Sequence, residues 1–458
     1  MEAVFTEFQK LNGTTWFYLS TLLAVAVYFR FNRFFCLRNW DLITLYLIVP
    51  GLLVTARVDN RMLQYLDEAR SQTQVVSANP RIELADNSMV ELQYGYLWLF
   101  AATGYLCLRC FVDLFLARRP RLPPNLDVAG LCFLGASLLA FLFFEAVTKE
   151  PDPAGRASAL VAAKMLEGKS PTTFEKTTPG VGPVNPSTAF FVGAVHVGVD
   201  SSQRVLQREV LTTQSDFAVG VARSAAILAH IFILAGLVVV GAKHFGSLPI
   251  GVGMATLYLL TPLTAINIAK IDQLLPAALV LWAVVFHRRP CIAGALLGVS
   301  CAFVFPIFLI PLWLGFYGSK GALRCLTGMV IAGALMALLF CLSGTARDFI
   351  DVWASSVVWR PEQLGFPGQT MSFWTEATRA FRLPIFVLFM FITLAVAFWP
   401  VEKNLAELIA LSVLLILGVQ FWYPHRGGTF VHWYLPLFLL MMFRPNLQNA
   451  LPPDPAKA

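Results

Sequence analysis

Charged residues are scarce in this chain of 458 residues: they make up 13% of it, whereas 57% of it is hydrophobic. Soluble globular domains carry about 25% charged residues, so the composition excludes an ordinary soluble protein. The sequence also lacks a Gly-rich phosphate loop, the HExxH and GxSxG motifs of hydrolases, and any Cys/His metal cluster. We therefore expect no soluble-domain chemistry, no bound metal and no cofactor.

Cysteine is absent from the longest polar connections, because all eight cysteines fall in apolar segments or short turns. A disulfide framework is therefore not expected. Residues 1–14 are polar, and no small-residue cleavage site follows the first apolar run, so that run is expected to be a span and not a signal peptide. The net charge of +7 lies mainly in short turns, which indicates membrane topology and not a nucleic-acid partner.

What the chain has in abundance is apolar runs of about 17 to 24 residues, the length that crosses a bilayer as a helix. We predict an all-α, polytopic transmembrane helical bundle that forms a single integral-membrane domain over residues 1–458. About 13 spans are expected, near residues 15–29, 40–56, 93–116, 125–147, 217–242, 249–266, 274–286, 290–304, 306–317, 323–343, 383–399, 404–422 and 430–443.

The connections between these spans alternate in character. One set is short and basic, whereas residues 57–92, 148–216 and 344–382 form long connections with nearly balanced charge. The positive-inside rule places the basic set in the cytoplasm. The long loops and the amino terminus then face outward from the plasma (inner) membrane, and residues 445–458 form a cytoplasmic, disordered tail.

The outward loops are expected to carry short helices at the membrane interface. Leu63 and Leu66 have helical spacing in the first loop, and Ala157–Leu166 has helical composition in the second, with Gly168 as its stop. Ser187–Val199 is apolar but too short to span, so it is expected to be interfacial or re-entrant.

One apolar stretch, Leu248–Phe286, is too long for a single span. Its 39 residues carry only Lys270 and Asp272 as charges, and as one helix they would measure about 58 Å, roughly twice the bilayer core. The chain is therefore predicted to reverse near Asn267–Gln273, at the outer face. Polar groups in such a place suggest a functional site, although a solvated turn between two spans is the simpler alternative.

A second polar turn lies near the end of the chain. Residues 420–436, QFWYPHRGGTFVHWYLP, mass aromatic side chains with His425, Arg426 and His432 at the outer face. Aromatics alone are typical of an interfacial belt. Arginine and histidine beside a Gly-Gly pair instead suit an anion such as a lipid phosphate. Both interpretations remain open from the sequence.

The run Ala269–Leu314 resembles the central block of the GT-C superfamily of integral-membrane glycosyltransferases, in the branch of polyprenyl-phosphate-dependent mannosyl- and arabinofuranosyltransferases. The polar turn of that block reads Lys270-Ile271-Asp272-Gln273 here, and its AGxxxG span reads Ala293-Gly294 to Gly298. Residues 420–436 also resemble the last outward loop of that branch. The resemblance implies transfer of a sugar from a polyprenyl-phosphate donor to a glycan or lipid acceptor at the outer leaflet.

The resemblance also implies roles for individual residues. An acidic residue before a helix of the type Ala162–Gly168 is the catalytic base of the family, which selects Asp152, and another alignment selects Asp59. The donor phosphate and sugar are then expected to contact a set of polar residues from the two turns and the third loop: Arg426, His425, His432, Arg360, Lys270, Asp272 and Gln273.

Two other functions fit the same sequence. A lipid or solute transporter needs polar residues along a path through the bilayer, where Lys270, Asp272, Arg223 and His230 are candidates. A scaffold subunit would use its loops to bind another membrane protein. Most polar residues cluster at one face, which favours the transferase.

Overall fold

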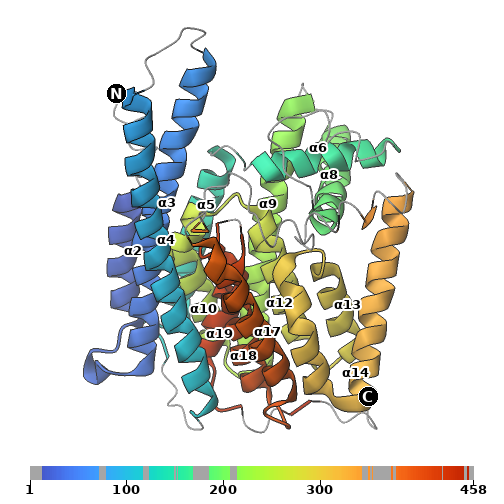
Figure 1. Cartoon of the computed structure of the whole chain (residues 1–458). Coiled ribbons are helices and arrows are strands. Elements are labelled where there is room, and N and C mark those ends of the chain that lie inside the picture. Colours follow the sequence, from blue (N-terminus) through green and yellow to red (C-terminus); the bar gives the residue numbers. More distant parts are fainter. Residues whose placement is uncertain are drawn as a thin grey trace.

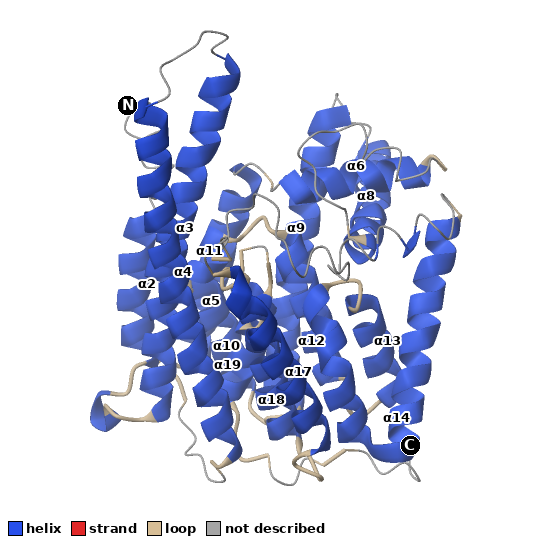
Figure 2. Ribbon diagram, viewed as in Figure 1, coloured by secondary structure: helices blue, strands red, loops and turns tan. Residues whose placement is uncertain are grey.

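The computed structural model describes residues 13–71, 79–116, 123–148, 151, 153–168, 185–206, 214–342, 349–350, 353, 373–374, 378–424, 426–447 and 451–452. Within these residues every regular element is a helix (Figure 2). The all-α prediction is thereby confirmed. The α-helices are α2 (Gly13–Tyr28), α3 (Leu37–Ser71), α4 (Asn79–Leu114), α5 (Val128–Thr148), α6 (Pro153–Leu166), α8 (Pro186–Leu206), α9 (Gln214–Lys243), α10 (Leu248–Leu260), α11 (Pro262–Ile266), α12 (Ile271–Val285), α13 (Pro290–Ser300), α14 (Val304–Cys341), α17 (Arg382–Phe398), α18 (Leu405–Trp422) and α19 (Leu435–Phe443).

Six helical segments are long and apolar enough to cross a membrane, and they mark the chain as a membrane protein. They lie at Leu37–Val58, Val90–Leu114, Val128–Thr148, Asp216–Lys243, Val304–Cys341 and Leu405–Trp422. Five shorter apolar helices stand beside them in the bundle (Figure 1), at Thr14–Tyr28, Leu248–Leu260, Ile271–Val285, Pro290–Ser300 and Arg382–Phe398.

The predicted break in the long apolar stretch is confirmed. Thr261 is extended between α10 and the five-residue α11, and the helix stops again at Asn267 before α12 begins at Ile271. Pro262 fits the first turn of α11 because that position needs no backbone N–H donor. Both α10 and α12 pack on α9, so the chain runs up and down against the same helix.

The first long connection differs from expectation. A separate short helix is predicted around Leu63 and Leu66, but α3 continues without interruption to Ser71. The periodicity of that segment is helical, and sequence spacing alone does not show whether such a helix is separate from the span before it. In the second long connection, α6 ends before Gly168, whose φ of 71° favours glycine, and α8 extends seven residues beyond the predicted Val199.

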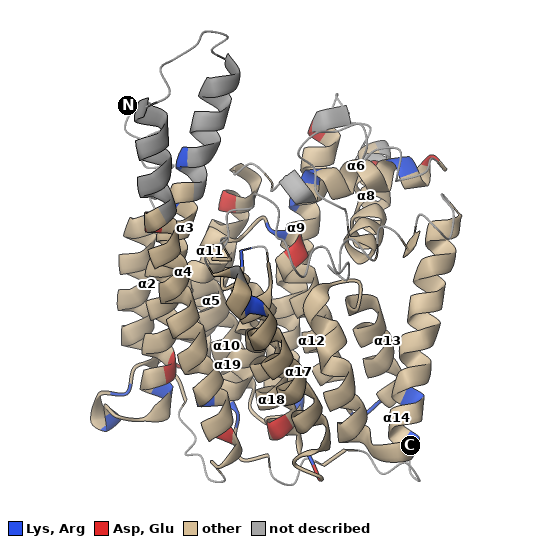
Figure 3. Ribbon diagram, viewed as in Figure 1, with Lys and Arg blue, Asp and Glu red and all other residues tan. Residues whose placement is uncertain are grey.

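The short connections meet at one end of the bundle. Arg30 and Arg38 both donate to Pro123 O, which joins the turn after α2 to the turn before α5. His244 Nε2 lies 2.9 Å from Val285 O, and Tyr317 OH donates to His287 O at 2.7 Å. Figure 3 shows charged residues at this end of the bundle and few of them along the middle of the helices.

Glycine permits very close packing of α13 against α14. A Cβ added at Gly294 would overlap Cys325 O, and one added at Gly328 would overlap Cys291 O. A Cβ added at Gly298 would lie 2.7 Å from Met329 O, which is also too close. The AGxxxG pattern of this chain is therefore a helix-packing motif, as small residues at membrane helix interfaces generally are.

We expect Gly294→Val to destabilise the protein by about 1–3 kcal/mol or more, because the new side chain overlaps backbone that cannot rotate away. Thermal unfolding of the purified protein in detergent measures the effect. Gly333→Val is the matched control, since nothing lies within 4 Å of a Cβ at Gly333 on α14. Equal unfolding temperatures for the two variants would contradict the packing role.

Candidate functional site

The ends of the long connections meet at the opposite end of the bundle, where the start of α8 is fixed to the membrane helices by three side chains. Asn185 Nδ2 donates to Ala302 O at 2.7 Å, and Ser187 Oγ donates to Val299 O at 2.5 Å. Thr188 Oγ1 donates to Asp272 Oδ1 at 2.9 Å. The second long connection therefore rests directly on the turn between α11 and α12.

That turn buries polar side-chain atoms that have no hydrogen-bond partner in the described part of the chain. Asn267 and Gln273 are both buried, yet Asn267 Nδ2 and Gln273 Oε1 make no hydrogen bond to any residue that the structure describes. Lys270 is the residue before α12, and Asp272 lies in its first turn. Negative charge near a helix N-terminus is favourable, so an aspartate suits this position in α12.

The second polar turn brings His432 to the same place. The short helix η3 (Val431–Trp433) packs on α12 and α11. His432 is 0% exposed, and neither of its ring nitrogens has a hydrogen-bond partner among the described residues. Lys270 lies within electrostatic range of His432. An imidazole buried in this way next to a cation is expected to be neutral.

His230 on α9 is also buried here, but its hydrogen bonds are complete. Its Nε2 lies 3.0 Å from Ile268 O, and its Nδ1 lies 2.9 Å from the Tyr258 hydroxyl. A carbonyl can only accept, so Nε2 carries the proton and Nδ1 accepts from Tyr258. The rings of His230 and Tyr258 meet His432 edge-on, at centroid distances of 6.2 and 6.0 Å. His230 is thus a packing and hydrogen-bonding group between helices.

A third set of polar groups borders the turn from the side of α17. Arg382 Nε donates to Trp422 O at 2.8 Å. Asp272 and Arg382 both lie within electrostatic range of Tyr423. Gln420 then holds the loop that leads to η3, because its Oε1 accepts from Gly428 N at 2.9 Å and its Nε2 donates to Phe430 O at 3.3 Å.

We call Asn267, Lys270, Asp272, Gln273 and His432 the polar end cluster. The sequence analysis predicts that four of these residues bind substrate: Lys270, Asp272, Gln273 and His432. The structure brings these four together. The sequence does not single out Thr188, which donates to Asp272. It also does not single out Arg382, which like Asp272 lies within electrostatic range of Tyr423. Arg382 could have been recognised as a candidate, because it is an arginine at the start of an apolar helix. Nothing in the local sequence marks Thr188.

The remaining predicted site residues lie elsewhere or outside the described residues. Arg426 is exposed on the last turn with φ 53°, and its carbonyl accepts from Thr429 Oγ1 at 2.8 Å. Asp59 lies on α3, and its side chain is not among those that the structure describes. The predictions for Asp152, His425 and Arg360 fall outside the described residues.

A separate network of buried charges lies at the other end of the bundle. Arg109 binds Asp41 through two hydrogen bonds of 2.6 and 3.0 Å and Asp113 through one of 2.8 Å. Arg444 then donates to Asp113 at 2.7 and 3.0 Å. Two arginines and two aspartates balance each other, and all are buried. The network ties α3, α4 and the end of α19 together, next to a polar cavity of about 60 Å³.

The chemistry of the polar end cluster suits an anionic, hydroxyl-bearing ligand. Asn267 and His432 offer donors, Gln273 offers an acceptor, and Lys270 supplies positive charge next to His432. The carboxylate of Asp272 accepts from Thr188 and can also accept from a ligand hydroxyl. No family model, curated protein or solved structure matches this chain.

Proposed function

We propose that the protein is an integral-membrane glycosyltransferase that moves a sugar from a polyprenyl-phosphate donor to a glycan or lipid acceptor. The polar end cluster receives the phosphate and sugar at the membrane face where the long connections lie. The observation that supports this proposal best is the unused hydrogen-bonding capacity of Asn267, Gln273 and His432 beside Lys270. Each buried polar group without a partner costs about 1–3 kcal/mol, and a bound ligand recovers that cost.

The proposal gives each part of the site a task. Lys270 and His432 bind the donor phosphate, and Asn267 and Gln273 hydrogen-bond to sugar hydroxyls. Arg426, His425 and Arg360 add positive charge from the loops, as the resemblance to the GT-C superfamily implies. Electrostatic stabilisation of a leaving phosphate is the largest single contribution that such residues make.

The base comes from one of the first two long connections predicted from the sequence. Asp152 is the first choice, because α6 begins one residue later and Gly155 lies beside Ile271, with a distance of 3.7 Å between its Cβ position and Ile271 Cγ2. Asp59 on α3 is the alternative, and α3 packs on α11. Both α6 and α3 pack against helices that border the turn, α6 against α12 and α3 against α11.

The reaction proposed is a single inverting displacement. The carboxylate removes the proton from the acceptor hydroxyl, whose oxygen attacks the anomeric carbon of the sugar. The bond between that carbon and the phosphate oxygen breaks, and the polyprenyl phosphate leaves with the electron pair. Lys270 stabilises the negative charge on the leaving phosphate. The donor chain stays in the bilayer throughout.

The proposal extends to topology. We place about 13 spans in the plasma (inner) membrane, and α14 contributes two of them because Gly318 interrupts its helical backbone with φ 65° and ψ −172°. The amino terminus and the long connections then face outward, with short interfacial helices between the spans. The last residues, 445–458, face the cytoplasm.

A transporter is the second candidate, and one observation favours it. Ionisable residues buried in membrane helices often mark ion pathways, and Arg109 and Asp113 lie within α4. Their charges are, however, paired with those of Asp41 and Arg444. The helices α9, α10 and α12 also bury apolar side chains, among them Ile233, Leu257 and Leu281.

We expect Lys270→Gln to lower the rate of sugar transfer by about 10²- to 10³-fold, because a positive charge is lost where the phosphate departs. A panel of polyprenyl-phospho-sugars supplied to the purified protein provides the assay. Lys320→Gln is the control, since Lys320 is exposed at the opposite end, next to the kink in α14. Wild-type turnover in Lys270→Gln would remove the cluster from the proposed reaction.

A further inference from the structure

A groove of about 250 Å³ lies between α2 and α3, away from the polar end cluster. Its lining is almost entirely apolar, and it extends from Phe17 and Pro50 down to Phe29 and Leu42, where the two helices are joined by a short turn. Thr21, Val25 and Tyr46 line it between these ends.

The two hydroxyls in this groove are already used. Thr21 Oγ1 donates to Phe17 O at 2.6 Å, and Tyr46 OH donates to Ser20 O at 3.1 Å. The groove therefore offers an occupant nothing but hydrocarbon contact. A hydrocarbon chain is the chemistry that fits it.

The turn at the lower end of the groove has the opposite character, because it is basic. Arg30 follows Phe29 directly, and Arg33 is exposed three residues later in η1 (Phe31–Arg33). Arg30 donates to Pro123 O through one terminal nitrogen, while its Nε has no partner among the described residues. Positive charge thus stands at the mouth of an apolar groove.

Asn39 holds this turn in one shape. Its side chain accepts from Arg30 N at 2.9 Å and donates to the carbonyls of Arg30, Arg33 and Phe34 at 3.0, 3.2 and 3.0 Å. Asn39 is itself fully buried. The arginines are therefore presented by a preorganised turn, which lowers the entropy cost of binding an anion.

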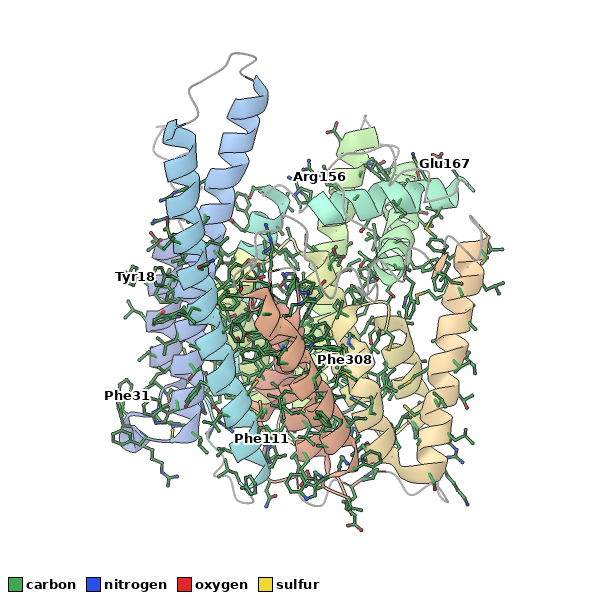
Figure 4. All side chains as sticks on the ribbon, in the orientation of Figure 1. Tyr18, Phe31, Phe111, Arg156, Glu167 and Phe308 are labelled. Carbon is green, nitrogen blue, oxygen red and sulfur yellow. The ribbon has the colours of Figure 1, made fainter. Side chains whose placement is uncertain are left out.

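The same turn exposes aromatic rings. Phe31, Phe34 and Phe35 are all exposed, the last at 80%, and Figure 4 shows Phe31 projecting away from the bundle below Tyr18. Exposed rings at the end of membrane helices lie in the interface between lipid and water. The turn is thus at headgroup depth, and the groove runs from it into the bilayer.

We propose that the groove between α2 and α3 is a binding site for an anionic phospholipid. One acyl chain lies along the groove, and the phosphate contacts Arg30 and Arg33 at its mouth. Charge complementarity selects an anionic headgroup over a zwitterionic one, because each basic residue at a membrane surface contributes about fivefold to the binding of anionic lipid. This site is independent of the proposed glycosyl transfer.

Photo-crosslinking tests the proposal in vesicles made of equal parts of phosphatidylglycerol and phosphatidylcholine. A trace of either lipid carries a diazirine on one acyl chain, and labelled peptides are located by mass spectrometry. Four variants are compared with the wild type: Arg33→Gln, Val25→Trp, Leu22→Trp and Arg324→Gln. Leu22 is 70% exposed on α2 outside the groove, and Arg324 is exposed on α14.

In the wild type, the phosphatidylglycerol probe is expected to label α2 and α3 peptides at least fivefold more than the phosphatidylcholine probe. Arg33→Gln should remove most of that preference, and Val25→Trp, which fills the groove, should remove the labelling by both probes. The two controls should behave as the wild type.

Equal labelling by the two probes in the wild type would overturn the proposal, as would unchanged labelling of Val25→Trp. Size-exclusion chromatography verifies that each variant is folded. If Val25→Trp does not fold, Arg33→Gln decides: a preference that persists in Arg33→Gln overturns the proposed headgroup contact.

Discussion

Replacing Asp152 by asparagine is expected to lower the turnover of sugar transfer by about 10²- to 10⁴-fold, the contribution of a positioned general base. Asparagine keeps the size of the side chain but cannot take the proton from the acceptor hydroxyl. The affinity for the donor should change little, because the donor phosphate is assigned to Lys270 and His432. Steady-state kinetics at saturating donor, together with donor binding, separate the two effects.

Asp59→Asn is the companion variant for that measurement. If Asp152 is the base, Asp59→Asn retains most of the activity. If Asp59→Asn loses turnover and Asp152→Asn does not, Asp59 is the base. Asp216→Asn serves as a control, because Asp216 lies in the first turn of α9 and has no part in the proposed reaction. Wild-type turnover in both Asp152→Asn and Asp59→Asn would contradict a carboxylate base from either loop.

Replacing Asp113 by leucine is expected to destabilise the protein by about 3–5 kcal/mol, because it leaves buried charge without compensation. Asp113 accepts from Arg109 at 2.8 Å and from Arg444 at 2.7 and 3.0 Å, and none of the three side chains is exposed. Without Asp113, Asp41 is the one carboxylate left in this network to balance the two guanidinium groups of Arg109 and Arg444. Unfolding in mixed micelles by denaturant gives the free energy directly.

The matched control is the exposed ion pair of Arg61 and Glu91, whose atoms are 3.0 Å apart. Glu91→Leu should cost less than about 1 kcal/mol, because water screens that pair. The double variant Asp113→Leu/Arg444→Leu should recover part of the loss, since Asp41 and Arg109 then balance each other. A loss of stability in Asp113→Leu no larger than in Glu91→Leu would show that the network is not structurally important.

The positions of the helices follow from local sequence to a large extent. The length of the apolar stretch around Lys270 and Asp272 requires a break, and the break lies at Thr261 and Asn267. The small residues of α13 pack as their pattern indicates. These features depend on residues that are near one another in the chain, so they can be predicted from a single sequence.

Other features depend on contacts between distant segments. Nothing near Gln273 in the chain indicates that His432 packs against the same turn, or that Thr188 bonds to Asp272. The buried charges of Arg109 and Asp113 were not predicted, because the hydropathy averaged over an apolar span stays high when two of its residues are charged. Their spacing of four, one helical turn, was the signal for a pair on one face.

The central claim is that the protein forms a glycosidic bond at the end of the bundle that holds the polar end cluster. Its most direct test supplies the protein, reconstituted in vesicles, with a polyprenyl-phosphate donor that carries a radiolabelled sugar and with candidate acceptors. We predict labelled product together with free polyprenyl phosphate, on the side of the long connections only, and loss of product in Lys270→Gln. Movement of intact labelled donor or sugar across the membrane without any new glycosidic bond would contradict the claim.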